Sequence, residues 1–290
     1  MHIRKQGRDY IAEFNSSGEF ATLAKSVPDK DAINRSGAGN DFLGYAQAAE
    51  NILAGSVPDD MMRQAQEIMD AVDISFRDRE VNQWMPSVAG AYPIVPEYLI
   101  GMPESMRERR PVESDQAPLD IYIEANIAAG VTARELAARG TAIAAFIMRA
   151  SEERTVSLNF LSHNKLGTGT AVGRHVFMRC KLDTHPVSLA QVLSMFAIAK
   201  SCRAVRFAAI QGVLLNQGMR CEPNNDSFEP AWRGLLERRT ERANKIRELW
   251  SIPDNAIIVQ RGNYEDADLM ERDPVEWVHR QLEKQRKILD

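Results

Sequence analysis

An alternation of aromatic and cationic side chains marks one stretch of the sequence as a candidate surface for nucleic acid. The residues from about Ala171 to Leu182 have a pattern typical of a β-strand. The strand's period of two places four side chains on one face: His175, Phe177, Arg179 and Lys181. The other face carries Val176, Met178 and Cys180, and we expect it to pack into the core. A surface that binds single-stranded nucleic acid needs this combination, because the cations bind phosphates and an aromatic ring stacks with a base.

This strand lies inside a strongly basic segment that runs from Arg154 to Cys221. The segment contains nine Lys and Arg residues and one acid, Asp183, so it sums to +8. Since the whole chain carries −4, the remaining residues must sum to −12. A contiguous cationic block in an acidic protein favours a polyanionic partner.

Four more basic residues complete the predicted binding path. Lys165 and Arg174 are expected to bind phosphates from the loop that precedes the strand, and Arg203 and Arg206 extend the path. A path with about five to nine phosphate contacts would make binding steeply dependent on salt. The alternative is that these residues only solvate one surface and pair with acids from elsewhere in the chain.

No pattern of residues indicates catalysis, a metal or a cofactor. The glycines at 167, 169 and 173 lack the strand–loop–helix order of a phosphate-binding loop and favour a hairpin tip. The histidines and cysteines show no Cys-x-x-Cys or His-x-x-x-His spacing. The spacing does not exclude a catalytic Cys–His pair, because such partners can lie far apart in the sequence and close together in the fold. No feature of the sequence indicates such a pair. We therefore expect a non-enzymatic binding protein without a cofactor.

Composition indicates a soluble globular protein of 290 residues with 44% hydrophobic and 26% charged residues. No apolar run approaches the roughly 18 to 20 residues of a membrane span, so we expect no membrane association. Three cysteines are too few for a disulfide framework and predict a reducing, cytoplasmic location.

The elements that position the site predict an α+β or α/β fold, with a mixed sheet flanked by helices. Strands are expected at residues 9–14, 119–124, 155–161, 171–182 and 256–259. Helices are expected at 16–26, 40–54, 59–72, 132–150, 187–199, 230–250 and 274–289, whereas 201–217 could be strand and then helix. The order strand–helix–strand over 119–161 predicts parallel pairing. We expect a core domain over residues 1–222 and a C-terminal helical extension over 223–290.

A proline-rich stretch from Trp84 to Pro118 predicts extended, irregular chain. Its large side chains indicate order, because a disordered linker would not keep them. The stretch is either a strap packed over the core or a binding loop with aromatic contacts, flanked by Arg107, Arg109 and Arg110.

The same stretch carries a family resemblance. The text from Trp84, Trp-Met-Pro-Ser-Val-Ala-Gly-Ala-Tyr-Pro-Ile-Val-Pro-Glu-Tyr-Leu-Ile-Gly-Met-Pro, is followed by the strand and helix of 119–150. Over about residues 84–210 this layout resembles the single-stranded-DNA-binding RNA polymerase cofactors of N4-like bacteriophages. The resemblance implies sequence-independent binding of single-stranded DNA, assistance to a phage-encoded RNA polymerase, and the cytoplasm of an infected bacterium as location.

Other interpretations stay open beside this one. The alternative function is a protein-interaction or virion-associated module whose basic face docks an acidic protein, and a homo-oligomer is possible. The strand–helix–strand layout also resembles a von Willebrand A-like domain, but residues 124–128 lack that family's metal motif.

Overall fold

The computed structural model forms two compact units. It describes residues 1–28, 44–72, 80–113, 118–125, 131–153, 155–165, 174–182, 187–219, 241–259 and 264–289. The larger unit comprises Met1–Asp73 and Pro118–Asp290. The smaller one comprises Ile74–Ala117, and we call it the inserted unit.

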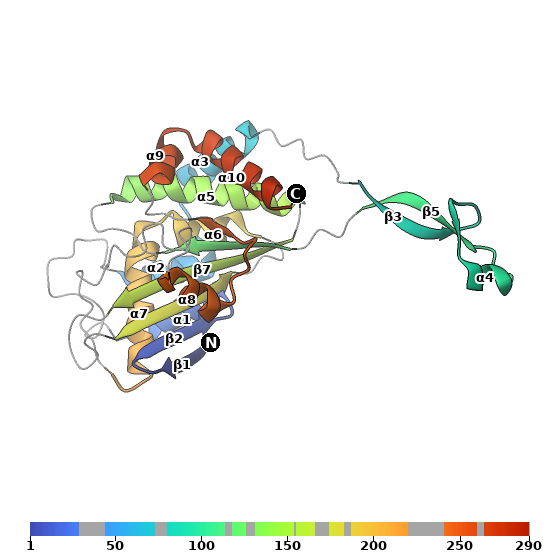
Figure 1. Ribbon diagram of the computed structural model, residues 1–290. Helices are drawn as coiled ribbons and strands as arrows, with labels where there is room; N and C mark the ends of the chain where they lie inside the picture. Colours follow the sequence, from blue (N-terminus) through green and yellow to red (C-terminus); the bar gives the residue numbers. More distant parts are fainter. Residues whose placement is uncertain are drawn as a thin grey trace. The chain divides into compact units, whose positions relative to one another are not determined.

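A six-stranded mixed sheet organises the larger unit, in the order β1-β2-β8-β7-β6-β9 (Figure 1). The strands are β1 (His2–Gln6), β2 (Asp9–Phe14), β6 (Leu119–Glu124), β7 (Val156–Lys165), β8 (His175–Leu182) and β9 (Ile257–Val259). The pairs β2–β8, β7–β6 and β6–β9 are parallel, whereas β1–β2 and β7–β8 are antiparallel. The predicted mixed sheet and the parallel pairing of 119–124 with 156–161 are therefore confirmed.

Helices cover one face of this sheet, and the reason is the alternation along its strands. Rings from β2 and β7 meet rings from α1 (Ser17–Ser26) and α6 (Leu189–Phe196) in one cluster. Phe20 packs edge-on against Phe14 and Phe160 with centroids 5.4 and 5.6 Å away, and Phe160 contacts Phe196 at 5.8 Å. Val176, Met178 and Cys180 are buried on this face, as the period of two predicted.

The other helices of this layer follow sequence signals closely. They are α2 (Tyr45–Ala54), α3 (Asp59–Ala71), α5 (Ala133–Glu153) and α7 (Arg206–Leu215). Thr132 and Glu135 form a capping box at the start of α5, since the Thr132 hydroxyl accepts a hydrogen bond from the Glu135 amide at 3.2 Å. The option of a strand within 201–217 is wrong, because Ser201–Val205 is a π-helix that continues into α7.

The C-terminal segment is largely helical, as expected, and packs against the rest of the larger unit. β9 pairs with β6, and α8 (Glu241–Trp250) packs on the second face of the sheet. The last two helices are α9 (Tyr264–Arg272) and α10 (Pro274–Leu289), and both contact α5. The Trp277 ring of α10 packs edge-on against the Phe146 ring of α5, with centroids 5.9 Å apart. The boundary expected at residue 222 lies outside the described residues.

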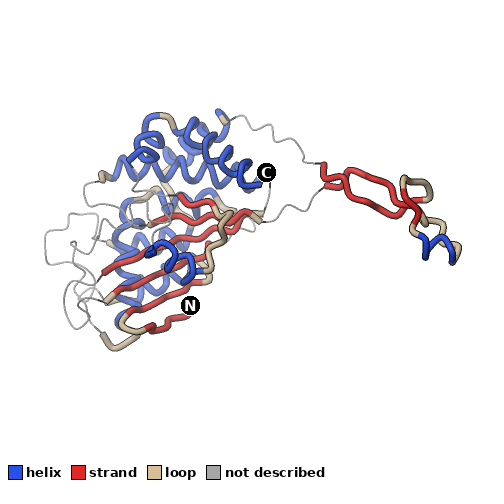
Figure 2. Tube along the Cα trace, viewed as in Figure 1, coloured by secondary structure: helices blue, strands red, loops and turns tan. Residues whose placement is uncertain are grey.

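The inserted unit contains a three-stranded antiparallel sheet in the order β3-β5-β4 (Figure 2). Its elements are β3 (Glu80–Ser87), β4 (Tyr92–Pro93), α4 (Val95–Leu99) and β5 (Met106–Glu113). The expectation of irregular chain is thus wrong. The prolines are accommodated because Pro86 and Pro93 lie in edge strands, and Pro96 lies in the first turn of α4. Pro111 lies beyond the two residues of β5 that pair with β4.

Large apolar side chains of the inserted unit face solvent over residues 88–102, which we call the apolar segment. Seven of them are at least half exposed: Val88, Tyr92, Val95, Tyr98, Leu99, Ile100 and Met102. Separately, no helix among the described residues is long and apolar enough to cross a membrane.

Candidate nucleic-acid-binding site

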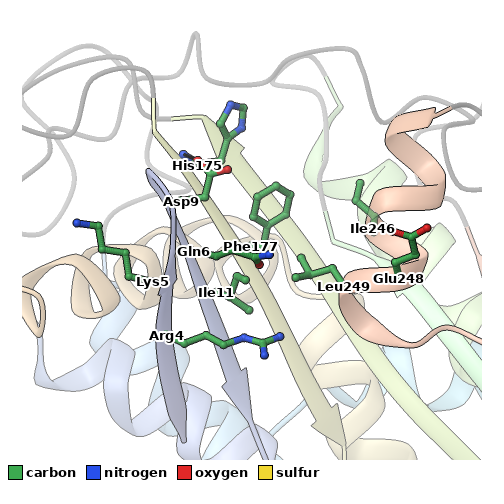
Figure 3. A pocket seen from close by; sticks show the side chains of 10 residues that line it. All are labelled: Arg4, Lys5, Gln6, Asp9, Ile11, His175, Phe177, Ile246, Glu248 and Leu249. Carbon is green, nitrogen blue, oxygen red and sulfur yellow. Dashed lines mark hydrogen bonds between the residues drawn. The ribbon is translucent and has the colours of Figure 1, made fainter.

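A pocket of about 770 Å³ opens on the sheet face that carries Phe177 (Figure 3). The edge strand β1 and its neighbour β2 form one side, β8 forms the floor, and α8 forms the other side. Figure 3 shows the Phe177 ring projecting from β8 toward Leu249 and Ile246 of α8. The lining residues are Arg4, Lys5, Gln6, Asp9, Ile11, His175, Phe177, Ile246, Glu248 and Leu249.

Three neighbouring rings provide the aromatic surface of the site. His163 lies opposite Phe177 on the paired strands β7 and β8, and their rings stack with centroids 4.6 Å apart. The His175 ring lies edge to edge with His163 and nearly parallel to it, with centroids 4.9 Å apart. His163 is buried, so His175 and Phe177 present the rings to the pocket.

The two imidazoles are also joined by a hydrogen bond, 2.6 Å between His163 Nε2 and His175 Nδ1. One nitrogen must donate and the other accept, because two protonated nitrogens cannot face each other. The pair therefore carries at most one positive charge while this bond is kept.

The charges around the pocket are balanced, not uniformly basic. Arg4 and Lys5 line it from β1, and Asp9 and Glu248 line it from β2 and α8. Asp9 is already engaged, since its Oδ1 accepts a hydrogen bond from the His175 backbone amide at 3.0 Å. Arg4 and Lys5 were missed in the prediction of the site, although the basic start of the chain was the signal that could have found them.

Arg179 and Lys181 share a strand face with Phe177, but only one of them is exposed. Arg179 donates to Glu13 at 2.8 Å and to the Trp250 carbonyl at 3.2 Å, and its guanidinium lies 5.2 Å from the centre of the Trp250 ring. It therefore holds α8 on the sheet. Lys181 is exposed and can reach a phosphate.

The remaining predicted residues do not join the pocket. Arg174 donates to the Tyr10 hydroxyl at 2.7 Å and is absent from the pocket lining. Lys165 is the last residue of β7, and its side chain lies outside the described part of the chain. The loop tip at 166–173 lies outside the described residues as well.

The prediction that Arg203 and Arg206 extend the binding path along the surface is wrong, because both side chains are buried. Arg206 is 0% exposed and donates to Asn164 at 2.9 Å, to Ser162 at 3.3 Å and to the Cys202 carbonyl at 3.2 Å. Arg203 donates to the Val131 carbonyl. These guanidinium groups support internal hydrogen bonding and cannot contact a surface ligand as placed.

A buried carboxyl, Glu124, lies at the end of β6. It is 4% exposed, and this burial raises its pKa to about 8, against the opposing effect of the Arg206 guanidinium. Glu124 is therefore mostly protonated at neutral pH. Among the described residues no group of His, Cys, Asp and Glu could hold a metal ion.

Comparisons with known proteins identify a family without an assigned role. No curated protein matches the sequence, and no solved structure matches it. One family model matches residues 2–235, which is most of the chain and includes the inserted unit. The chain belongs to the family described as Domain of unknown function (DUF7192).

Proposed function

We propose that this protein binds single-stranded DNA with little sequence preference and takes a base into the pocket beside Phe177. The observation that carries the proposal is the aromatic cluster of Phe177, His175 and His163 at a pocket with two cationic side chains on its margin. Stacking tolerates any base because every base has a π-face. A paired base in a duplex cannot enter such a pocket.

Three cations support a phosphate path at this site. Arg4 and Lys5 lie at the pocket, where Arg4 Nη2 is 3.6 Å from Glu13 Oε1, and Lys181 is exposed on the face of β8 that carries Phe177. With about 0.7 counterions released per phosphate of a single strand, three contacts correspond to a salt slope of about −2. This is shallower than the sequence predicted, because Arg179, Arg203 and Arg206 make internal contacts instead.

The role in transcription rests on the resemblance of residues 84–210 to phage RNA polymerase cofactors. On that basis we propose that the protein assists a phage-encoded polymerase while bound to exposed single strands. The burial of Arg203 and Arg206 reduces the basic face both for DNA and for the alternative, an acidic protein docked on that face.

Fluorescence anisotropy with a labelled oligothymidine, titrated at several salt concentrations with duplex competitor, tests the proposal. Phe177→Leu keeps apolar packing against the α8 cluster but removes the ring face. It should weaken binding by about 1–3 kcal/mol, or roughly 5- to 150-fold, at low salt. Lys5→Ala should reduce the salt slope by about 0.7.

Arg63→Ala provides the matched control, because Arg63 lies on α3 and its side chain is 72% exposed. It should leave both affinity and slope unchanged. Equal competition by duplex, or an unchanged affinity of a folded Phe177→Leu variant, would refute the assignment of this site.

A further inference from the structure

The apolar segment of the inserted unit exposes more apolar surface than a monomer usually does. Leu99 and Ile100 are each 76% exposed, Val88 is 72% and Tyr98 is 67% exposed. Seven side chains that each expose on the order of 100 Å² present roughly 700 Å², above the roughly 300–600 Å² of the largest patch on a typical monomer. This area approaches the roughly 800 Å² that each partner contributes to a standard interface.

The apolar segment is held by hydrogen bonds and is not a loose loop. The Ala91 amide donates to the Arg107 carbonyl at 2.8 Å, and the Ile94 amide donates to the Ser105 carbonyl at 2.7 Å. Gly90 permits this close approach, since a Cβ there would lie 2.2 Å from the Arg107 carbonyl oxygen. An ordered segment loses little conformational entropy on binding, which favours its use as an interface.

The inserted unit cannot bury these side chains itself. Over residues 86–108 the buried side chains are Ser87 and Ser105, and no apolar side chain in that range is buried. A small single-layered sheet needs a second layer against which its apolar side chains pack. The missing layer must come from another surface.

Two neighbouring features of the unit are complementary to each other. A groove of about 610 Å³ is lined by residues 92–96 and Arg107. Next to it, the end of α4 and the turn that follows expose Leu99, Ile100 and Met102, with the acids Glu97 and Glu104 on either side in sequence. A twofold axis would place the apolar turn of one copy in the groove of the other, with acids of the turn beside Arg107. Self-complementary surfaces of this kind form isologous dimers.

We propose that the apolar segment is the interface for a second copy of this chain. This inference is independent of DNA binding. The chain has a mass of 32.5 kDa, so light scattering on the eluting protein should give twice this mass at micromolar concentration.

The test is the double substitution Leu99→Ser with Ile100→Ser. Because both side chains are exposed, the substitutions should leave the fold intact and return the mass to 32.5 kDa. Leu53→Ser is the matched control, since Leu53 is a 47% exposed leucine on α2 of the larger unit, and it should remain dimeric. A wild-type monomer at about 100 µM, or a dimer that survives the double substitution, would overturn the proposal.

Cross-linking gives a second reading at the same surface. In a Cys221→Ser background the two other cysteines are buried, so Ile100→Cys adds one accessible thiol. A flexible bis-maleimide, which can span the distance between two turns seated in opposite grooves, should link two copies through it, whereas a cysteine at Leu53 should not link. Flotation of the wild-type protein with phosphatidylcholine vesicles, lost in the double variant, would instead identify a lipid surface as the occupant and overturn the proposal.

Discussion

Replacing Glu124 by Gln tests whether a neutral carboxyl is buried beside Arg206. Burial raises the pKa of Glu124 to about 8 in the folded protein, whereas its ordinary value is 4.5. The folded state therefore keeps a proton that the unfolded state releases as the pH rises above 4.5. Stability falls with pH in this window, by roughly 1.4 kcal/mol per unit, until Glu124 ionises in the folded state near pH 8.

The magnitude follows from these two pKa values. Between pH 5 and pH 8 the linkage removes about 3 kcal/mol of unfolding free energy from the wild type. Gln has a similar shape and no titration, so Glu124→Gln should lack this loss. The unfolding free energy of the variant minus that of the wild type should therefore increase by about 3 kcal/mol from pH 5 to pH 8.

Urea unfolding of both proteins at pH 5, 6, 7 and 8 measures the difference. The comparison cancels the titration of all other groups, and Glu67→Gln, at a 68% exposed side chain on α3, is the control. A difference that stays constant with pH would refute the reasoning. It would mean that Glu124 is ionised in the folded state and forms an ion pair with Arg206.

Three further predictions concern packing, capping and thiol burial. Gly140→Ala should lower stability by about 3 kcal/mol or more and Tm by several degrees in calorimetry, because its Cβ would lie 2.3 Å from the Cα of Ala197, the C-cap of α6; an unchanged Tm would contradict this contact between α5 and the end of α6. Thr132→Ala should cost about 1 kcal/mol in urea unfolding, since it removes the cap of α5, and Thr132→Ser should restore most of it. In Cys221→Ser protein, Ellman's reagent should titrate no thiol quickly before denaturation and two thiols after it, because Cys180 and Cys202 are buried. Rapid native reaction would show that one of them is accessible.

The strands and helices of the sheet unit could be predicted because their local signals agree with the fold. The alternation along residues 175–182 identified the core face of β8 correctly, and Thr132 with Glu135 located the start of α5. The inserted unit was missed because its prolines suppress the strand signal. Their edge positions, which make strands possible, depend on pairing partners that the local sequence does not reveal.

The candidate site could be predicted only in part. The ring of Phe177 and the imidazole of His175 lie where the strand pattern placed them, at a pocket. Arg203 and Arg206 were wrongly predicted to lie on the surface, because the prediction used the charge of the segment and not the positions of these residues on a helix. Arg203 and Arg206 stand among apolar residues on all sides of a helix, a pattern typical of a buried helix. The cover that α8 gives to Arg179 is a tertiary contact without local signal.

The place of β9 beside β6 affects how the nascent chain is protected during synthesis. Ile121 of β6 pairs with Ile257 of β9, so the ribosome must add 136 further residues before this edge of β6 can be hydrogen-bonded. At roughly 5–20 residues per second, translation leaves that edge open for on the order of 7 to 27 s. β6 is an apolar strand, and an unpaired strand of this kind is a template for aggregation. The three residues of β9 thus pair this edge of β6 late in synthesis.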